Sequence, residues 1–388
     1  MNKRTKKTVT TLRILAATLT CLWVTYSYGS GSFVPDPATH NAATRAVYNQ
    51  LSSLPGVMLG LGRLGPFAEP TSAGGIKVGN KPAHYPANLA WWKAEYGDHL
   101  PSAMGFELTV QWGEKWLSRS ANRKRAFARI EAFAKKGGLP LVRDHAKRLD
   151  LPSNTKHASA YDRGSGHVLR RLLPTGQDHD RFVAYYTHLA KRFKALGYPV
   201  VFRPFHEMNG RWFWWGGQPK AFKKLWREVH AIFAAQGVRN VLWCWTVSGR
   251  GNPGESIKDY YPGDQYVDLF AIDYYAATPT FSSLLRRRLN TLVQMAHGRP
   301  IFFGDFGIVA SSYLYTHALP SLFQAYPDIK GVMLWWGTGW RPWRLMGPYA
   351  GSAIDNRTPA RVRNAFSQFL ARPDIIDLNR WRSLMAGN

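Results

Sequence analysis

One glutamate with an unusual set of neighbours carries most of the chemical information in this sequence. Glu207 follows an apolar run and lies beside His206, and four aromatic residues occupy positions 212–215. Apolar surroundings raise the pKa of a carboxylic acid, and aromatic rings offer flat faces to the C–H groups of sugars. A protonated carboxyl group can donate its proton to a glycosidic oxygen. The segment therefore predicts a general acid in a sugar-cleaving site. It argues against the interpretation that the four aromatic residues only pack in the core.

The histidines and cysteines favour neither a metal site nor a disulfide scaffold. The 12 histidines show no ligand spacing such as His-Glu-x-x-His. Of the two cysteines, Cys21 lies in the N-terminal leader and Cys244 in an apolar run, so the exported chain cannot form an internal disulfide. We therefore expect no metal and no cofactor.

Eight short apolar runs, separated by amphipathic stretches, are the elements that must position this acid. A parallel sheet of strand–helix units produces this pattern, and eight units can close a barrel. The sequence thus predicts an α/β fold, a (β/α)8 TIM barrel that forms a single catalytic domain over residues 32–388. The eight runs span 56–61, 103–108, 139–144, 200–205, 241–246, 267–272, 301–305 and 332–336.

Polar residues gather where these runs end. In a closed barrel, the carboxyl ends of all strands face the same mouth, and this is where active sites form. Side chains that are distant in the sequence are therefore expected to converge there. The set comprises Glu107, Asp144, His145, His206, Glu207, Asp273, Tyr274, Tyr275 and Asp305.

The segment around Glu207 resembles a known family. Residues 203–210 (Arg-Pro-Phe-His-Glu-Met-Asn-Gly) with the aromatic run 212–215 are similar to the acid/base segment of glycoside hydrolase family 26, which consists mostly of retaining endo-β-1,4-mannanases. Residues 261–275 are similar to the family's segment around strand six. The resemblance spans most of residues 56–345, and the first three strands match least well. It implies a barrel with Glu207 as general acid/base and the nucleophile on the seventh strand.

The resemblance also implies roles for several further residues. The segment 143–146 departs from the family pattern, so His145 can equally be a satisfied residue of the barrel mouth. Carried over position by position, the roles are charge stabilisation of the nucleophile by Arg203, a place beside it for His206, a hydrogen bond to it from Tyr275, an aromatic contact beside the scissile bond from Trp212, a floor under the sugar from Trp335 or Trp336, and a hydrogen bond to the glycone side from His145.

The nucleophile position carries an important departure from the family. Asp305 stands where the family has glutamate, and it is one methylene shorter. Retaining enzymes hold their two carboxyl groups about 5 to 5.5 Å apart and inverting enzymes about 6.5 to 9.5 Å apart. Three outcomes are open. In the first, the backbone advances with the conformational freedom of Gly304 and Gly307, so that Asp305 attacks the anomeric carbon. In the second, Asp305 positions a water molecule and the enzyme inverts, and in the third, catalysis is lost. We expect the first.

The chain is strongly basic, with 51 Lys and Arg against 24 Asp and Glu and a net charge of +27. A basic protein attracts polyanions. The basic residues are scattered over expected helices and no recognition motif is present, so we expect no nucleic-acid partner. An acidic polysaccharide would suit the charge, with Arg143 or Arg211 pairing with its carboxylates. The oligomeric state is left open.

Residues 1–31 predict an export signal or a membrane anchor. Five basic residues precede the apolar stretch 14–28, which is shorter than the roughly 20 residues of a full span. Small residues near position 29 fit a cleavage site, but the usual alanines are missing, so an uncleaved anchor is open as well. We expect residues 32–388 to be secreted or periplasmic, and the only membrane contact to be through residues 14–28.

The sequence leaves two functions open. The first is an exported endo-acting glycosidase that cleaves a β-linked, mannan-like polysaccharide by double displacement with Glu207 and Asp305. The second is a polysaccharide-binding protein on the same scaffold, weak or inactive in catalysis, that serves exopolysaccharide assembly or export. Hydrolysis that depends on Glu207 separates the two.

Overall fold

The computed structural model describes most of the chain beyond its N-terminal leader. All described residues belong to the unit Ser32–Asn388. The leader predicted over residues 1–31 lies outside them, and so does Trp336. No helix within the described ranges is long and apolar enough to cross a membrane. The described residues are 38–62, 77–78, 81–82, 89–108, 119–151, 160, 167–276, 278, 280–308, 310–335 and 359–387.

Eight parallel strands form the predicted barrel. β10 pairs with β1 along Met58–Leu61, which closes the sheet. A short strand β11 (Ile375–Ile376) adds to the start of β1, and β2 (Lys77–Val78) pairs with β3 (Lys81–Pro82) in a separate sheet. Each predicted run overlaps a barrel strand, so the prediction of a (β/α)8 barrel is confirmed. In order around the barrel, the strands are β1 (Val57–Leu61), β4 (Ala103–Glu107), β5 (Leu139–Asp144), β6 (Val200–Pro204), β7 (Val241–Ser248), β8 (Leu269–Ala276), β9 (Ile301–Ile308) and β10 (Ile329–Leu334).

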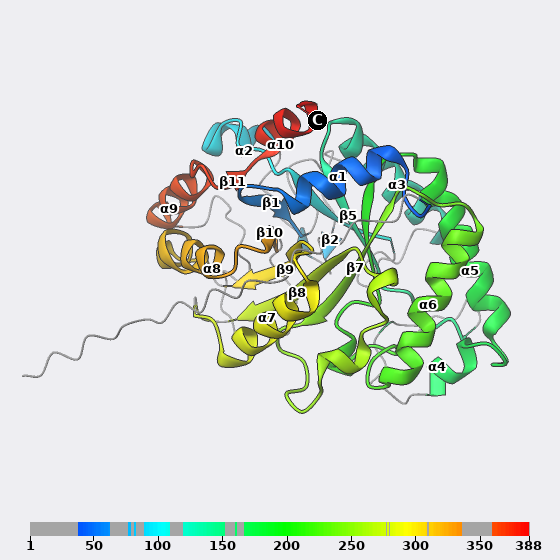
Figure 1. Ribbon diagram of the computed structural model, residues 1–388. Helices are drawn as coiled ribbons and strands as arrows, with labels where there is room; N and C mark the ends of the chain where they lie inside the picture. The colour runs from blue at the N-terminus through cyan, green and yellow to red at the C-terminus, as the bar shows by residue number, and fades with distance from the viewer. Residues whose placement is uncertain are drawn as a thin grey trace, which may run out of the picture. The chain divides into compact units, whose positions relative to one another are not determined.

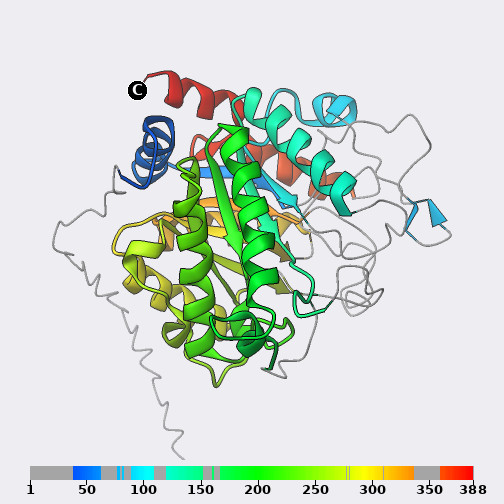
Figure 2. The same ribbon diagram turned by 90° about the vertical axis from the view of Figure 1, so that its right-hand side faces the viewer.

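The helices surround the strands. Figure 1 shows α5 and α6 on one side of the barrel and α8 and α9 on the other, and Figure 2 shows α5 and α6 side by side. Apolar residues recur every three to four positions in α6, which gives this helix one buried face. The helices are α1 (Ala42–Ser52), α2 (Leu89–Tyr96), α3 (Arg119–Lys135), α4 (His167–Leu172), α5 (His179–Leu196), α6 (Pro219–Ala235), α7 (Ser283–Ala296), α8 (Leu319–Ala325), α9 (Ala360–Leu370) and α10 (Leu378–Ala386), with shorter turns η1 (Met208–Gly210), η2 (Ile257–Tyr260), η3 (Asp264–Tyr266) and η4 (Leu314–Ala318).

The amino half of the barrel interior is an apolar core. Helices α1 and α10 contribute Leu51 and Trp381 to it, and they close this end of the barrel. Because alternate strand residues point inward, every strand supplies one or two side chains. The interior core contains Met58, Ala103, Leu139, Leu141, Val201, Leu242, Cys244, Leu269, Ala271, Phe302 and Met333.

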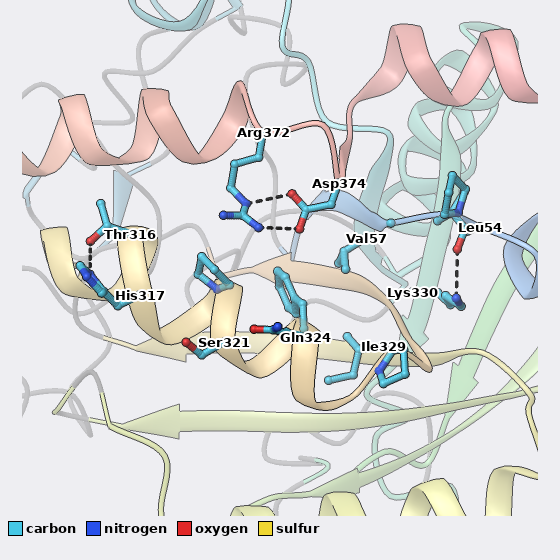
Figure 3. A pocket seen from close by; sticks show the side chains of 15 residues that line it. Leu54, Val57, Thr316, His317, Ser321, Gln324, Ile329, Lys330, Arg372 and Asp374 are labelled. Carbon is cyan, nitrogen blue, oxygen red and sulfur yellow. Dashed lines mark hydrogen bonds and ion pairs between the residues drawn. The ribbon is translucent and has the colours of Figure 1, made fainter. Parts of the chain in front are cut away.

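A pocket of about 720 Å³ lies near the amino ends of β1 and β10. Figure 3 shows Arg372 paired with Asp374 above it and Lys330 donating a hydrogen bond to the backbone carbonyl of Leu54 over 3.0 Å. None of the predicted site residues lines this pocket. The chemistry predicted from the sequence belongs to the opposite ends of the strands.

Candidate active site

The carboxyl ends of the strands carry a polar layer above the apolar core. Register places Glu107, Arg143 and Arg203 at one level on β4, β5 and β6, and it pairs Asp273 with Asp305 on β8 and β9. Residues paired across parallel strands point to the same face of the sheet. Two arginines and three carboxylates from five strands therefore meet inside the barrel mouth.

Glu207 lies just beyond β6 in a strained loop. Its φ is 57°, and Phe205 and Arg211 in the same loop also have positive φ values of 49° and 59°. The loop is held by Asn209, which donates a 3.0 Å hydrogen bond to the carbonyl of Ser248 and accepts one of 2.8 Å from its amide. Residues other than glycine rarely adopt this conformation, and such strain concentrates at functional sites.

The surroundings of Glu207 favour the protonated form of its carboxyl group. Burial, together with the negative charge of Asp305, raises the pKa of Glu207 to about 7. The indole Nε1 of Trp212 donates a 2.8 Å hydrogen bond to Oε2, which favours the ionised form and limits the rise. Near neutral pH, Glu207 therefore retains a large protonated fraction, as a general acid requires.

Asp305 faces the interior because β9 contains a bulge. The register of β9 against β8 shifts at Gly304. Phe303 and Phe306 both pack outward into the main core, whereas a Cβ added to Gly304 would collide with the guanidinium of Arg203. Gly304 and Asp305 thus both point inward, although strict alternation would turn one of them outward.

Two arginines hold the carboxylate of Asp305. Nη1 of Arg143 lies 2.6 Å from Oδ1 and 2.5 Å from Oδ2, while the nearest nitrogen of Arg203 lies 3.8 Å from Oδ2. Arg143 is only 4% exposed, so the expectation that it pairs with an acidic substrate is wrong. Arg211, the other candidate, is exposed and pairs with Glu255.

Arg203 forms most of its hydrogen bonds with the bulge of β9 and with its neighbours on β7 and β8. It donates hydrogen bonds of 2.5 Å to Oδ1 of Asp273, 2.7 Å to the carbonyl of Gly304 and 3.1 Å to Oγ1 of Thr246. These contacts fix the guanidinium below the carboxylate of Asp305. Its charge still acts on Asp305, but at a longer distance than that of Arg143.

Glu107 connects Arg143 to His145. Oε2 of Glu107 lies 2.8 Å from Nε of Arg143 and 2.5 Å from Nδ1 of His145. Burial alone would raise its pKa, but His145 and Arg143 outweigh burial and lower the pKa of Glu107 to about 2. His145 also meets the ring of His206 edge-on at 4.4 Å. His145 therefore has partners within the barrel mouth, and its proposed contact with a sugar stays a prediction.

His206 is packed beneath this group. Its side chain is buried, and burial lowers its pKa well below the usual value. Its ring lies 5.0 Å from that of Phe213 and 6.0 Å from that of Trp215. His206 is therefore a neutral imidazole near neutral pH.

Only one of the four aromatic residues after Glu207 remains partly exposed. Trp212 contacts the carboxyl group, whereas Phe213, Trp214 and Trp215 are at most 2% exposed. The two buried indoles donate their N–H groups to backbone carbonyls. Three of the four rings thus form the core on which the strained loop rests, and only Trp212, the one ring expected beside the scissile bond, stays partly exposed next to Glu207.

Tyr275 and Trp335 form the opposite part of the mouth. Both are partly exposed, and their rings meet edge-on at 5.7 Å. Burial and the charge of Asp305 raise the pKa of Tyr275 well above its usual value, so its hydroxyl keeps its proton. Of the two tryptophans expected to form the floor under a sugar, Trp335 is the one that lies within the described residues. Within the described part of the chain, no group of His, Cys, Asp and Glu could hold a metal ion.

Comparisons with known proteins point to one family of glycosidases. A family model for glycosyl hydrolase family 26 matches residues 44–303. A mannan endo-1,4-β-mannosidase of Bacillus subtilis is 25% identical over 214 residues, covering 53% of this chain and 58% of the relative. Mannan endo-1,4-β-mannosidase A and B of Caldalkalibacillus mannanilyticus is 26% identical over 244 residues, covering 56% of this chain and 43% of the relative. The chain thus spans about half the length of these curated relatives.

Solved structures share the barrel fold. An endo-β-1,4-mannanase double mutant from Cellulomonas fimi superposes with a TM-score of 0.68 and 23% identity, covering 88% of this chain and 77% of that one. A β-mannanase from Bacteroides ovatus superposes with a TM-score of 0.64 and 21% identity, covering 87% and 95%.

Proposed function

Because the chain belongs to glycosyl hydrolase family 26, we propose that it hydrolyses internal β-linkages of a mannan-like polysaccharide. The observation that carries this proposal is the contrast between two carboxyl groups at one barrel mouth. Glu207 has a pKa of about 7, while both oxygens of Asp305 contact the guanidinium of Arg143. Environments that separate two carboxyl groups in this way assign one as acid and the other as base or nucleophile.

The proposed reaction is a double displacement. Asp305 forms a bond to the anomeric carbon while Glu207 gives its proton to the departing glycosidic oxygen. Glu207, now ionised, then removes a proton from water, which attacks the anomeric carbon and frees Asp305. The bulge at Gly304 turns the short side chain of Asp305 into the barrel mouth, as this mechanism requires.

The cleaved sugar unit is proposed to be neutral. Arg143 pairs with Glu107 and Asp305, and Arg203 pairs with Asp273, so both arginine charges in the polar layer are already matched. A carboxylated sugar would meet no free cation among these residues. Hydrolysis of neutral mannan should therefore change little between low and high salt.

The binding-protein alternative also has an observation in its favour. Both carboxylate oxygens of Asp305 contact Arg143, and an oxygen held this way is a weaker nucleophile. In that case the barrel mouth would bind glycan without cleaving it. Export of the chain, predicted from residues 1–31, would place either activity among extracellular polysaccharides.

Product release from a panel of glycans separates these functions. The full chain and its Glu207→Ala variant would be incubated with neutral mannan, glucomannan, cellulose and an acidic exopolysaccharide, and new reducing ends would be measured. We expect release from mannan by the parent only. Retention of glycan in affinity electrophoresis without new reducing ends would support the binding function.

The rate of hydrolysis should fall as the pH rises through about 7. The reactive form carries the proton on Glu207, and this form is populated below its pKa. Trp212→Phe removes the hydrogen bond that favours the ionised form, so the alkaline limb should move to higher pH. Profiles of kcat/KM against pH for both proteins measure this. If the alkaline limb of the Trp212→Phe variant stays at the pH of the parent, the limb reports the titration of a group other than Glu207.

A further inference from the structure

We propose that Arg143 is a positioning residue matched in length to Asp305, so that the short carboxylate and the arginine across from it work only as a pair. This inference rests on the proposed function, since it takes Asp305 as the nucleophile. It assigns to Arg143 a role that the sequence did not indicate.

The two side chains meet across the barrel. Arg143 is on β5 and Asp305 on β9, which are the third and seventh of the eight barrel strands and therefore lie opposite one another. Nη1 of Arg143 contacts both oxygens of Asp305 at 2.6 and 2.5 Å. A single nitrogen thus sets the distance of both carboxylate oxygens through charge-assisted hydrogen bonds.

Arg143 is itself held in place. Its Nε donates a 2.8 Å hydrogen bond to Glu107, and its guanidinium carbon lies 4.9 Å from the ring centre of Trp335. Burial and two carboxylate partners leave few alternative rotamers to this side chain. Arg143 therefore holds the carboxylate of Asp305 at a fixed distance from β5.

Among the described residues, two close neighbours limit the space for a longer side chain at position 305. A further methylene would move the carboxylate by about 1.5 Å, while Nη1 of Arg143 already lies at hydrogen-bond distance. On another side, a Cβ placed on Gly62 would come within 2.9 Å of Oδ1, so the backbone there is close as well. A glutamate at 305 requires a shorter residue at 143, because the two would otherwise overlap.

A double-mutant cycle on the full chain tests this pairing. Asp305→Glu, Arg143→Gln and the double variant would be compared with the parent by kcat and KM on β-1,4-mannohexaose and by thermal unfolding. Each single change should lower kcat by about a hundredfold, as a misplacement of about 1 Å does, with a smaller effect on KM. In the double variant, the shorter glutamine makes room for glutamate, and kcat should recover at least about tenfold over either single variant.

Two controls define the outcomes. Arg227→Gln alters a distant arginine that binds the carbonyl of Pro262, and it should not rescue Asp305→Glu. Additive losses of kcat in the Arg143 double variant would overturn the pairing while leaving hydrolysis established. If the parent releases no product, the proposed function fails, and melting temperatures decide the pairing: Asp305→Glu should lower the melting temperature in the parent but not in Arg143→Gln, and equal losses would overturn it.

Discussion

Glu207→Gln is expected to lower kcat/KM on mannan by about 10²- to 10⁴-fold, the usual contribution of a general acid. Glutamine keeps the size of the side chain and its contact with Trp212 but cannot give a proton to the glycosidic oxygen. The loss should depend on the leaving group. An aryl mannoside with a dinitrophenolate leaving group needs no protonation, so formation of its glycosyl–enzyme intermediate should be nearly as fast as in the parent.

The matched control is Glu228→Gln on α6, a partly exposed glutamate whose carboxylate lies 3.6 Å from His179. It should retain the parent's kcat/KM. Steady-state kinetics on mannan and on the aryl mannoside provide both comparisons. Equal losses on the two substrates would contradict the acid role of Glu207, because they would show that its proton is not what the reaction needs.

Asp305→Asn is expected to lower kcat by at least on the order of 10³-fold, as removal of a reacting group does in other enzymes. The amide keeps the shape of the side chain and cannot form the covalent intermediate. A second effect follows from the same change. The charge of Asp305 contributes to the raised pKa of Glu207, so the pKa of Glu207 in the variant should fall below about 7.

Kinetics and a ¹³C NMR titration of glutamate carboxyl groups would measure these two effects in one variant. Asp98→Asn, an exposed position, is the control and should change neither value. A variant that keeps its activity would rule out Asp305 as nucleophile. An unchanged titration of Glu207 would show that the two carboxyl groups do not interact.

The sequence predicted the barrel because each strand leaves its own local pattern. Buried parallel strands appear as short apolar runs, and eight of them were recognisable. Their ends were less clear. β7 extends to Ser248 and β8 to Ala276, beyond the apolar runs, because the polar residues of the barrel mouth are still part of these strands.

The site was predictable where one segment carries it and not where contacts cross the barrel. Glu207 and its neighbours are contiguous in the sequence. The contact between Arg143 and Asp305 depends on the register of opposite strands, which no local pattern encodes. Alternation did contain a signal for Arg143, since it lies two residues after the inward-facing Leu141. The bulge broke the same alternation at Asp305.

The aromatic run after Glu207 shows a second reason why the site could not be fully predicted from the sequence. A run of rings beside an acid fits both a sugar surface and a packed core, and composition alone cannot separate them. The backbone separates them here. Positive φ values at Phe205, Glu207 and Arg211 turn the loop so that positions 213–215 point inward. The rings that pack beneath the strained loop are thus not the ring that stays partly exposed beside Glu207.

The anomeric form of the first product tests the proposed function most directly. Proton NMR would follow cleavage of β-1,4-mannohexaose by the full chain within the first minutes, before mutarotation. Double displacement with Glu207 and Asp305 predicts that the β-anomer appears first and then equilibrates. Initial release of the α-anomer would contradict Asp305 as nucleophile, and the absence of any new anomeric signal would contradict hydrolysis itself.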